Sequence, residues 1–332
     1  DVLLIGGISG KTSPALEWFG SLIHLRVGAS GVDLPGMLTM SSRLRRSIKP
    51  YKKAVMRSLG QQQDELTVIS FPKSGRTWLQ VMLGEYITRH YGLEVGNVMA
   101  LKQYTKHIEG IPRIRFAHDF RPQWKTPDEL QNDKSMYRHQ KILLLVRDPR
   151  DVLVSSYFEK TRRKPAKRKE KPRFTGSIND FVRQDIGGID TIIAFYNNWL
   201  GNRDVPIDFR IVRYEDLRAD TREVFAEILE YIGIPGVKAE ILDEVMELGR
   251  IEKMRKMEAQ SARGEHGTRR TDPNVESAFM TRAFQPADPN DPETFKVRKG
   301  KVGGYVDYLG EEEIAFLGRK IRDELDPEFG YD

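Results

Sequence analysis

A lysine, a glycine and two hydroxyl residues directly follow an apolar run in SFPKSGRTWLQ, residues 70–80. The run up to Phe71 predicts a buried strand, and the residues after the loop predict a helix. Backbone N–H groups at a helix N-terminus attract anions, Lys73 adds a positive charge, and Ser74 and Thr77 add hydroxyl donors. The stretch lacks the G-x-x-x-x-G-K-[ST] spacing of a triphosphate loop, so we expect it to bind about one phosphate group.

Two further stretches carry residues suited to a second phosphate group. In LLLVRDPRDVLVSSY, residues 143–157, Arg147 stands at the carboxyl end of a predicted strand and Ser155 lies in the helix expected next. Open α/β sheets bind ligands outside the carboxyl ends of their strands. Far downstream, the Gly-rich stretch VRKGKVGGY adds three cations, Arg298, Lys299 and Lys301. The sequence therefore favours an anionic ligand held by segments that lie far apart in the chain.

Together, the three stretches resemble the cofactor motifs of the cytosolic-type sulfotransferases, in a bacterial-like form, which use 3′-phosphoadenosine 5′-phosphosulfate (PAPS). FPKSGRTW is similar to that family's 5′-phosphosulfate loop, usually Y-P-K-S-G-T-T-W. VRDPRDVLVSSY resembles its 3′-phosphate strand and helix, and RKGKVGGY resembles its C-terminal R-K-G-x-x-G-D-W loop. The order and the separation of the motifs also fit, and the resemblance covers roughly residues 64–330.

The resemblance implies a role for each matching residue. The 5′-phosphosulfate and the adenine side would contact Lys73, Ser74, Gly75, Arg76, Thr77 and Trp78. The 3′-phosphate would contact Arg147, Ser155, Arg298, Lys299 and Gly300. Tyr214, in VRYEDL, matches a tyrosine near the adenine. RIEKMRKME, residues 250–258, resembles the segment that covers the purine and would contribute Ile251 and Met254.

The chain departs from the family pattern at several of these positions. Arg76 replaces the first threonine of the phosphosulfate loop, and the sequence leaves open whether it adds charge on the sulfuryl side or points to solvent. Ile251 stands where an aromatic residue is common, which puts stacking on the base in doubt. Gly304 and Tyr305 replace the Asp-Trp pair of the last motif.

Sulfuryl transfer to an alcohol needs a base for the hydroxyl proton, and histidine suits this role near neutral pH. Of the six histidines, His118 ends the predicted strand RIRFAH, so we expect it at the same sheet edge as Arg147. It matches the family's catalytic histidine in K-T-H-x-P, although Phe116 and Ala117 replace the Lys-Thr pair. The resemblance implies that His118 is the general base and that Lys73 stabilises the leaving phosphate. A sulfuryl group carries less charge than a phosphoryl group, so no metal ion is expected.

The elements that must position these residues alternate along the chain. Apolar runs predict strands at 66–71, 113–118, 141–146 and 208–214. Helical patterns predict helices at 76–91, 149–160, 221–233 and 311–325, and Gly233 ends the third of them. This alternation predicts an α/β protein with a central parallel sheet flanked by helices and a P-loop-like phosphosulfate loop.

The composition fits a globular protein of 332 residues, 39% hydrophobic and 31% charged. The net charge of +6 favours anionic partners. The chain has no cysteine, which excludes disulfides and cysteine-ligated zinc and agrees with the cytoplasmic location we expect. No apolar run approaches the roughly 18 residues of a transmembrane segment. Residues 1–39 are Gly-rich, so we expect a weakly ordered N-terminal extension there and a single sulfotransferase domain over 40–332.

Two other functions stay open from the sequence alone. A P-loop kinase or nucleotide hydrolase would use Asp148 as its magnesium carboxylate, but the chain lacks the required loop spacing. A basic nucleic-acid-binding module would use the basic stretch 161–173, which has no interleaved aromatic residues.

The partner we expect is a small-molecule, lipid or carrier-bound hydroxyl acceptor, and not nucleic acid. Its pocket would come from the loops at 92–112, 161–176 and 262–290. Basic residues after Met40 and in 161–173 leave open a peripheral contact with a membrane or with a carrier protein.

Overall fold

The computed structural model describes residues 26–28, 31–33, 65–95, 97–162, 174–262, 286, 288 and 290–331. The chain divides into two compact units, residues 1–63 and 64–332. In the first unit, β1 (Arg26–Gly28) pairs in antiparallel fashion with β2 (Gly31–Asp33). The domain start expected near Met40 lies outside the described residues, as do most of the loops at 161–176 and 262–277. The expectations for these segments therefore remain predictions.

The second unit is built on a four-stranded sheet in which every neighbouring pair is parallel. Its strands are β3 (Glu65–Ser70), β4 (Arg113–Ala117), β5 (Gln140–Val146) and β6 (Asp208–Arg213), in the order β4-β3-β5-β6. Ile69 of β3 lies opposite both Ala117 of β4 and Leu144 of β5, so the strands end at nearly the same level. The parallel sheet and its four strands confirm the predicted α/β fold.

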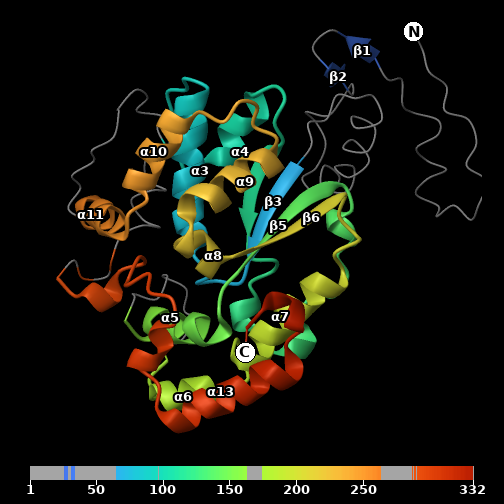
Figure 1. The fold of residues 1–332 in the computed structure, drawn as a ribbon. Coiled ribbons are helices and arrows are strands. Elements are labelled where there is room, and N and C mark those ends of the chain that lie inside the picture. The colour runs from blue at the N-terminus through green and yellow to red at the C-terminus, as the bar shows by residue number, and fades with distance from the viewer. Residues whose placement is uncertain are drawn as a thin grey trace, which may run out of the picture. The chain divides into compact units, whose positions relative to one another are not determined.

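Helices cover both faces of this sheet (Figure 1). One face carries α3 (Arg76–His90), α4 (Leu101–Tyr104), α8 (Tyr214–Ala219), α9 (Thr221–Ile232) and α10 (Ala239–Leu248). The other carries α5 (Pro149–Arg162), α6 (Ile178–Val182), α7 (Ile189–Gly201) and α13 (Glu311–Glu324). Helix α11 (Ile251–Ala262) precedes the C-terminal segment. The short 3-10 helices are η2 (Thr105–His107), η3 (Pro122–Trp124), η4 (Pro127–Glu129), η5 (Ser135–Tyr137), η6 (Pro292–Thr294), η7 (Gly304–Asp307) and η8 (Pro327–Phe329).

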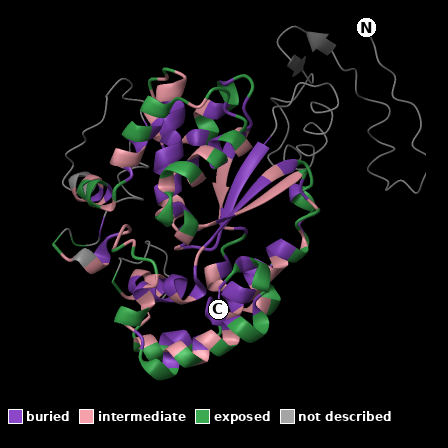
Figure 2. Ribbon diagram, viewed as in Figure 1, coloured by how far each residue is buried: buried purple, intermediate pink, exposed green. Residues whose placement is uncertain are grey.

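The alternation of side chains along each strand explains why there are two cores. Leu66 and Val68 of β3 pack into the core under α3 and α9, whereas Ile69 packs into the core under α5 and α7. Both faces of the central strands are therefore buried, as Figure 2 shows. The sequence pattern did not predict α7, although its Tyr196 and Trp199 are fully buried in the second core. Within the described ranges, no helix is both long enough and apolar enough to cross a bilayer.

Candidate active site

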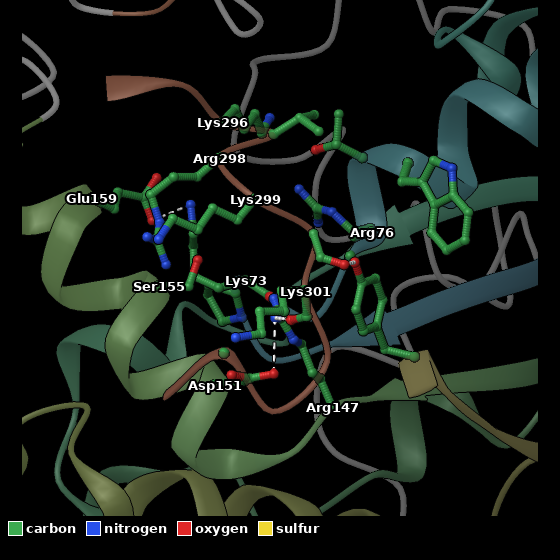
Figure 3. A pocket seen from close by; sticks show the side chains of 18 of the residues that line it. Lys73, Arg76, Arg147, Asp151, Ser155, Glu159, Lys296, Arg298, Lys299 and Lys301 are labelled. Carbon is green, nitrogen blue, oxygen red and sulfur yellow. Dashed lines mark hydrogen bonds and ion pairs between the residues drawn. The ribbon is translucent and has the colours of Figure 1, made fainter. Parts of the chain in front are cut away.

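The carboxyl ends of the four parallel strands meet at one edge of the sheet, and a candidate site residue follows each of them. His118 directly follows β4, Arg147 follows β5 and Tyr214 follows β6. Lys73 lies in the loop between β3 and α3. All four line one pocket of about 290 Å³, shown in Figure 3. The sheet therefore brings together residues that are widely separated in the sequence.

The loop after β3 has a backbone suited to binding an anion. Lys73 and Gly75 both have positive φ angles, 79° and 87°. A Cβ atom at Gly75 would lie 2.5 Å from Cδ2 of Tyr214, so only glycine fits this position. Gly75 is the N-cap of α3 and no side chain caps that helix. The first N–H groups of α3 are therefore available to an anion in the pocket.

His118 is held in one tautomer and is neutral. Its Nδ1 donates a hydrogen bond to the carbonyl oxygen of Ser70 at 2.9 Å, since a carbonyl can only accept. Nε2 therefore carries the lone pair that can take a proton. Burial and the positive charge of nearby Arg76 lower the pKa of His118 from 6.5 to about 3. The ring is in its basic form at neutral pH.

The turn after this histidine is strained and is clamped by a buried ion pair. Asp119, Phe120 and Arg121 have φ angles of 42°, 62° and 61°, the left-handed region that residues other than glycine rarely adopt. Lys134 Nζ lies 2.6 Å from Oδ2 of Asp119, and the Tyr137 hydroxyl donates to Oδ1 at 2.9 Å. Both charged side chains are 2% exposed. The clamp fixes the backbone next to the candidate base, and the sequence pattern gave no sign of it.

Arg147 connects the phosphate loop, α5 and the C-terminal segment. Its Nη1 donates to the carbonyl of Lys73 (3.3 Å), and its Nη2 donates to Oδ2 of Asp151 (3.1 Å) and to the carbonyl of Lys301 (3.0 Å). The guanidinium also lies 4.5 Å from the centre of the Tyr214 ring. The arginine is therefore fixed from three directions at the floor of the pocket.

Asp151 is a pocket residue that sequence reasoning missed. Its carboxylate accepts hydrogen bonds from the backbone N–H groups of Gly303 (3.0 Å) and Tyr305 (2.9 Å) as well as from Arg147. It therefore ties the C-terminal Gly-rich loop to α5. An acidic residue four positions after Arg147, inside a cationic motif, was the available signal.

The C-terminal segment supplies the remaining cations. The guanidinium of Arg298 lies 4.3 Å from the centre of the Phe158 ring and donates to Oε2 of Glu293 at 3.0 Å. Lys299 Nζ lies 4.7 Å from the centre of the Tyr308 ring. The segment is anchored to α11 because Glu258 accepts the backbone N–H groups of residues 296 and 297.

Gly300 allows this segment to pass close to α11. Its φ is 61°, and a Cβ atom there would lie 2.0 Å from Cδ1 of Ile251. The hydroxyl of Tyr214 donates to the carbonyl oxygen of Gly300 at 3.1 Å. Any larger residue would push the loop away from both contacts.

Most of the predicted site residues line the pocket, but two do not. Those that do are Lys73, Gly75, Arg76, Thr77, Trp78, His118, Arg147, Ser155, Tyr214, Ile251, Arg298, Lys299 and Gly300. Ser74 is fully buried within the loop, and Met254 is buried in the core between the sheet and its helices. Glu159 and Lys296 line the pocket without having been predicted. Seven Lys and Arg side chains and two carboxylates line it in all, which favours an anionic ligand.

The carboxylate expected for a magnesium-dependent kinase does not line this pocket. Asp148 is absent from the pocket wall, and its two oxygens accept hydrogen bonds from Arg150 at 2.8 to 3.2 Å. Within the described part of the chain, no group of three or more acidic or histidine side chains is arranged to bind a metal ion. Nothing in this geometry favours the kinase interpretation.

A parallel α/β sheet with a P-loop-like loop and a cationic pocket at the carboxyl ends of its strands is suited to binding an anionic nucleotide. Residues 63–326 match the family model of the sulfotransferase domain. The chain therefore belongs to the sulfotransferase family, as its motifs predicted.

The individual similarities are distant. The chain is 25% identical to rat sulfotransferase 2A2 over 185 residues, 52% of this chain and 60% of that protein. It is 21% identical to Arabidopsis thaliana cytosolic sulfotransferase 12 over 282 residues, 79% and 77% of the two chains. It is 26% identical to guinea pig 3-beta-hydroxysteroid sulfotransferase over 238 residues, 69% and 76%. The solved structure of retinol dehydratase with retinol and PAP has a TM-score of 0.51 at 18% identity, covering 83% and 86%, and shares the fold.

Proposed function

We propose that this enzyme transfers the sulfuryl group of PAPS to a hydroxyl group of an acceptor, with His118 as the general base. The observation that supports this most directly is that a neutral histidine and the phosphate-loop lysine line the same cationic pocket. The similar retinol dehydratase was crystallised with PAP, the desulfated form of the donor.

The pocket has cations suited to both phosphates of such a donor. Lys73 and the N-terminus of α3 would bind the 5′-phosphate. Arg147, Ser155 and Arg298 would bind the 3′-phosphate, with Lys299 beside them.

The reaction needs one bond to form, one to break and one proton to move. The acceptor oxygen bonds to sulfur while the bond from sulfur to the 5′-phosphate oxygen breaks. Nε2 of His118 takes the hydroxyl proton, because Nδ1 is held by Ser70. Lys73 stabilises the negative charge that develops on the leaving oxygen. Glu159 lies 3.6 Å from Lys73 Nζ, so the phosphate must compete with this carboxylate for the ammonium group.

The relatives suggest where to look for the acceptor. One is named a 3-beta-hydroxysteroid sulfotransferase and another, from rabbit, an amine sulfotransferase. We propose that this chain also acts on a small molecule, and steroid and other lipid alcohols are the first class to test. A plant relative is named cytosolic, and we expect this protein to act in the cytoplasm. Contact with a membrane or a carrier protein remains a separate prediction.

The test is transfer of label from ³⁵S-PAPS to a panel of alcohols, phenols, amines and a cell extract. We expect His118→Ala to lower turnover by about a hundredfold or more while PAP still binds. His107→Ala is the matched control, because His107 is exposed and does not line the pocket. Near-normal turnover in His118→Ala would remove it from the mechanism.

A second measurement tests the donor. Wild-type enzyme should prefer PAPS to adenosine 5′-phosphosulfate by at least about a hundredfold, since several charge-assisted hydrogen bonds to the 3′-phosphate are lost in the latter. Equal affinity for the two nucleotides would contradict the assignment of Arg147 and Arg298. Transfer to no acceptor at all would contradict the function.

A further inference from the structure

Arg76 differs from the other two arginines that line the pocket. Arg147 and Arg298 each bind a carboxylate, at 3.1 and 3.0 Å. Among the described residues, the guanidinium of Arg76 makes no hydrogen bond or ion pair, although the negative charge of Glu159, another pocket residue, acts on it. It is nevertheless half-buried, and burial lowers its pKa to about 10. A desolvated guanidinium with no directly bonded anion is costly, which indicates that it binds an anion in another state of the enzyme.

The position of Arg76 indicates which anion this is. It is the first residue of α3, directly after the loop that carries Lys73. Its charge also acts on His118, which places it close to the candidate base. In Figure 3 its side chain lies among those that line the pocket. Arg76 therefore lies near both the leaving group and the base, the two ends of the path that the sulfuryl group follows.

A comparison of the three pocket arginines leads to the same group. Lys73 suits the 5′-phosphate of the donor, and Arg147 and Arg298 suit the 3′-phosphate. The sulfuryl group is the remaining anion, and Arg76 is the remaining guanidinium. A guanidinium can donate two parallel hydrogen bonds to two oxygens of one such group.

Resting on the proposed function, we propose that Arg76 binds the sulfuryl oxygens of PAPS and so makes the enzyme discriminate the donor from PAP. PAP lacks the sulfuryl group, so its binding leaves Arg76 without a directly bonded anion. Pairing with the sulfuryl group also offsets the positive charge that disfavours protonation of His118. The base therefore becomes stronger when the donor is in place.

The experiment compares the dissociation constants of PAPS and PAP by calorimetry, without acceptor. In Arg76→Met we expect PAPS to bind about tenfold more weakly or worse, because a charge-assisted contact is lost, while PAP changes by less than about threefold. Arg76→Lys keeps the positive charge but cannot donate two parallel hydrogen bonds, so it should retain part of the preference for PAPS over PAP. Arg89→Met is the matched control, since Arg89 lies in the last turn of the same helix, outside the pocket.

Retained PAP affinity in Arg76→Met also shows that the variant is folded. An equal loss for PAPS and PAP would overturn the inference and assign Arg76 to a phosphate. Unchanged affinity for both, with only a higher KM for the acceptor, would overturn it and assign Arg76 to the acceptor. A wild-type protein that binds neither nucleotide would overturn the proposed function itself, whereas the other outcomes leave that function standing.

Discussion

Acidification should destabilise this protein through one partly buried side chain, His118. The pKa of the ring is about 3 in the folded protein and 6.5 in an exposed histidine. Between these values the unfolded chain binds a proton that the folded chain does not, so the free energy of unfolding falls as the pH falls. This contribution is absent above pH 6.5 and grows down to about pH 3.

The size of the effect follows from the two pKa values. Each pH unit within the window costs about 1.4 kcal/mol, so about 2 kcal/mol is lost between pH 6.5 and pH 5. The physical cause is burial first and the charge of Arg76 second. Arg76→Met should therefore reduce the loss without abolishing it.

The assay is urea unfolding of wild-type protein and His118→Asn at pH 7, 6 and 5, followed by tryptophan fluorescence. Asparagine does not titrate here, and its amide can still donate to the carbonyl of Ser70. We expect the wild type to lose about 2 kcal/mol more than His118→Asn on acidification. His107→Asn, at an exposed position, should behave as wild type. Equal acid losses in wild type and His118→Asn would refute the argument that the folded ring resists protonation.

Three further perturbations test separate parts of the site. Lys134→Met leaves the Asp119 carboxylate buried without its cation and should cost about 3 to 5 kcal/mol in urea unfolding; a cost below about 1 kcal/mol would contradict the clamp. Gly300→Ala should weaken PAP binding by about tenfold because of the clash with Ile251, and adding Ile251→Ala should restore part of the affinity; no effect in the PAP titration would mean that the loop does not contact the nucleotide. Lys73→Ala should lower kcat more than it weakens PAPS binding, and a change in apparent KM alone would contradict its role at the leaving oxygen.

The positions of the site residues relative to the strands could be predicted from the sequence. Apolar runs predicted the four strands to within one or two residues, because a buried parallel strand needs consecutive apolar side chains. His118 and Arg147 each directly follow such a strand, so their meeting at one sheet edge followed from the parallel arrangement. The loop at Lys73 was predictable for the same reason, since its chemistry lies within a few consecutive residues.

The sequence by itself determined which residues stand at the ends of strands and which short motifs carry charge. Only the tertiary structure decided how those charges are paired and how far they are buried. Asp119 pairs with Lys134, 15 residues further along the chain, and Asp151 binds backbone N–H groups from a segment about 150 residues away. Neither the low pKa of His118 nor the desolvation of Arg76 could be predicted, because both depend on neighbours supplied by other segments. Burial is a property of the packed chain, whereas strand ends and motifs are properties of consecutive residues.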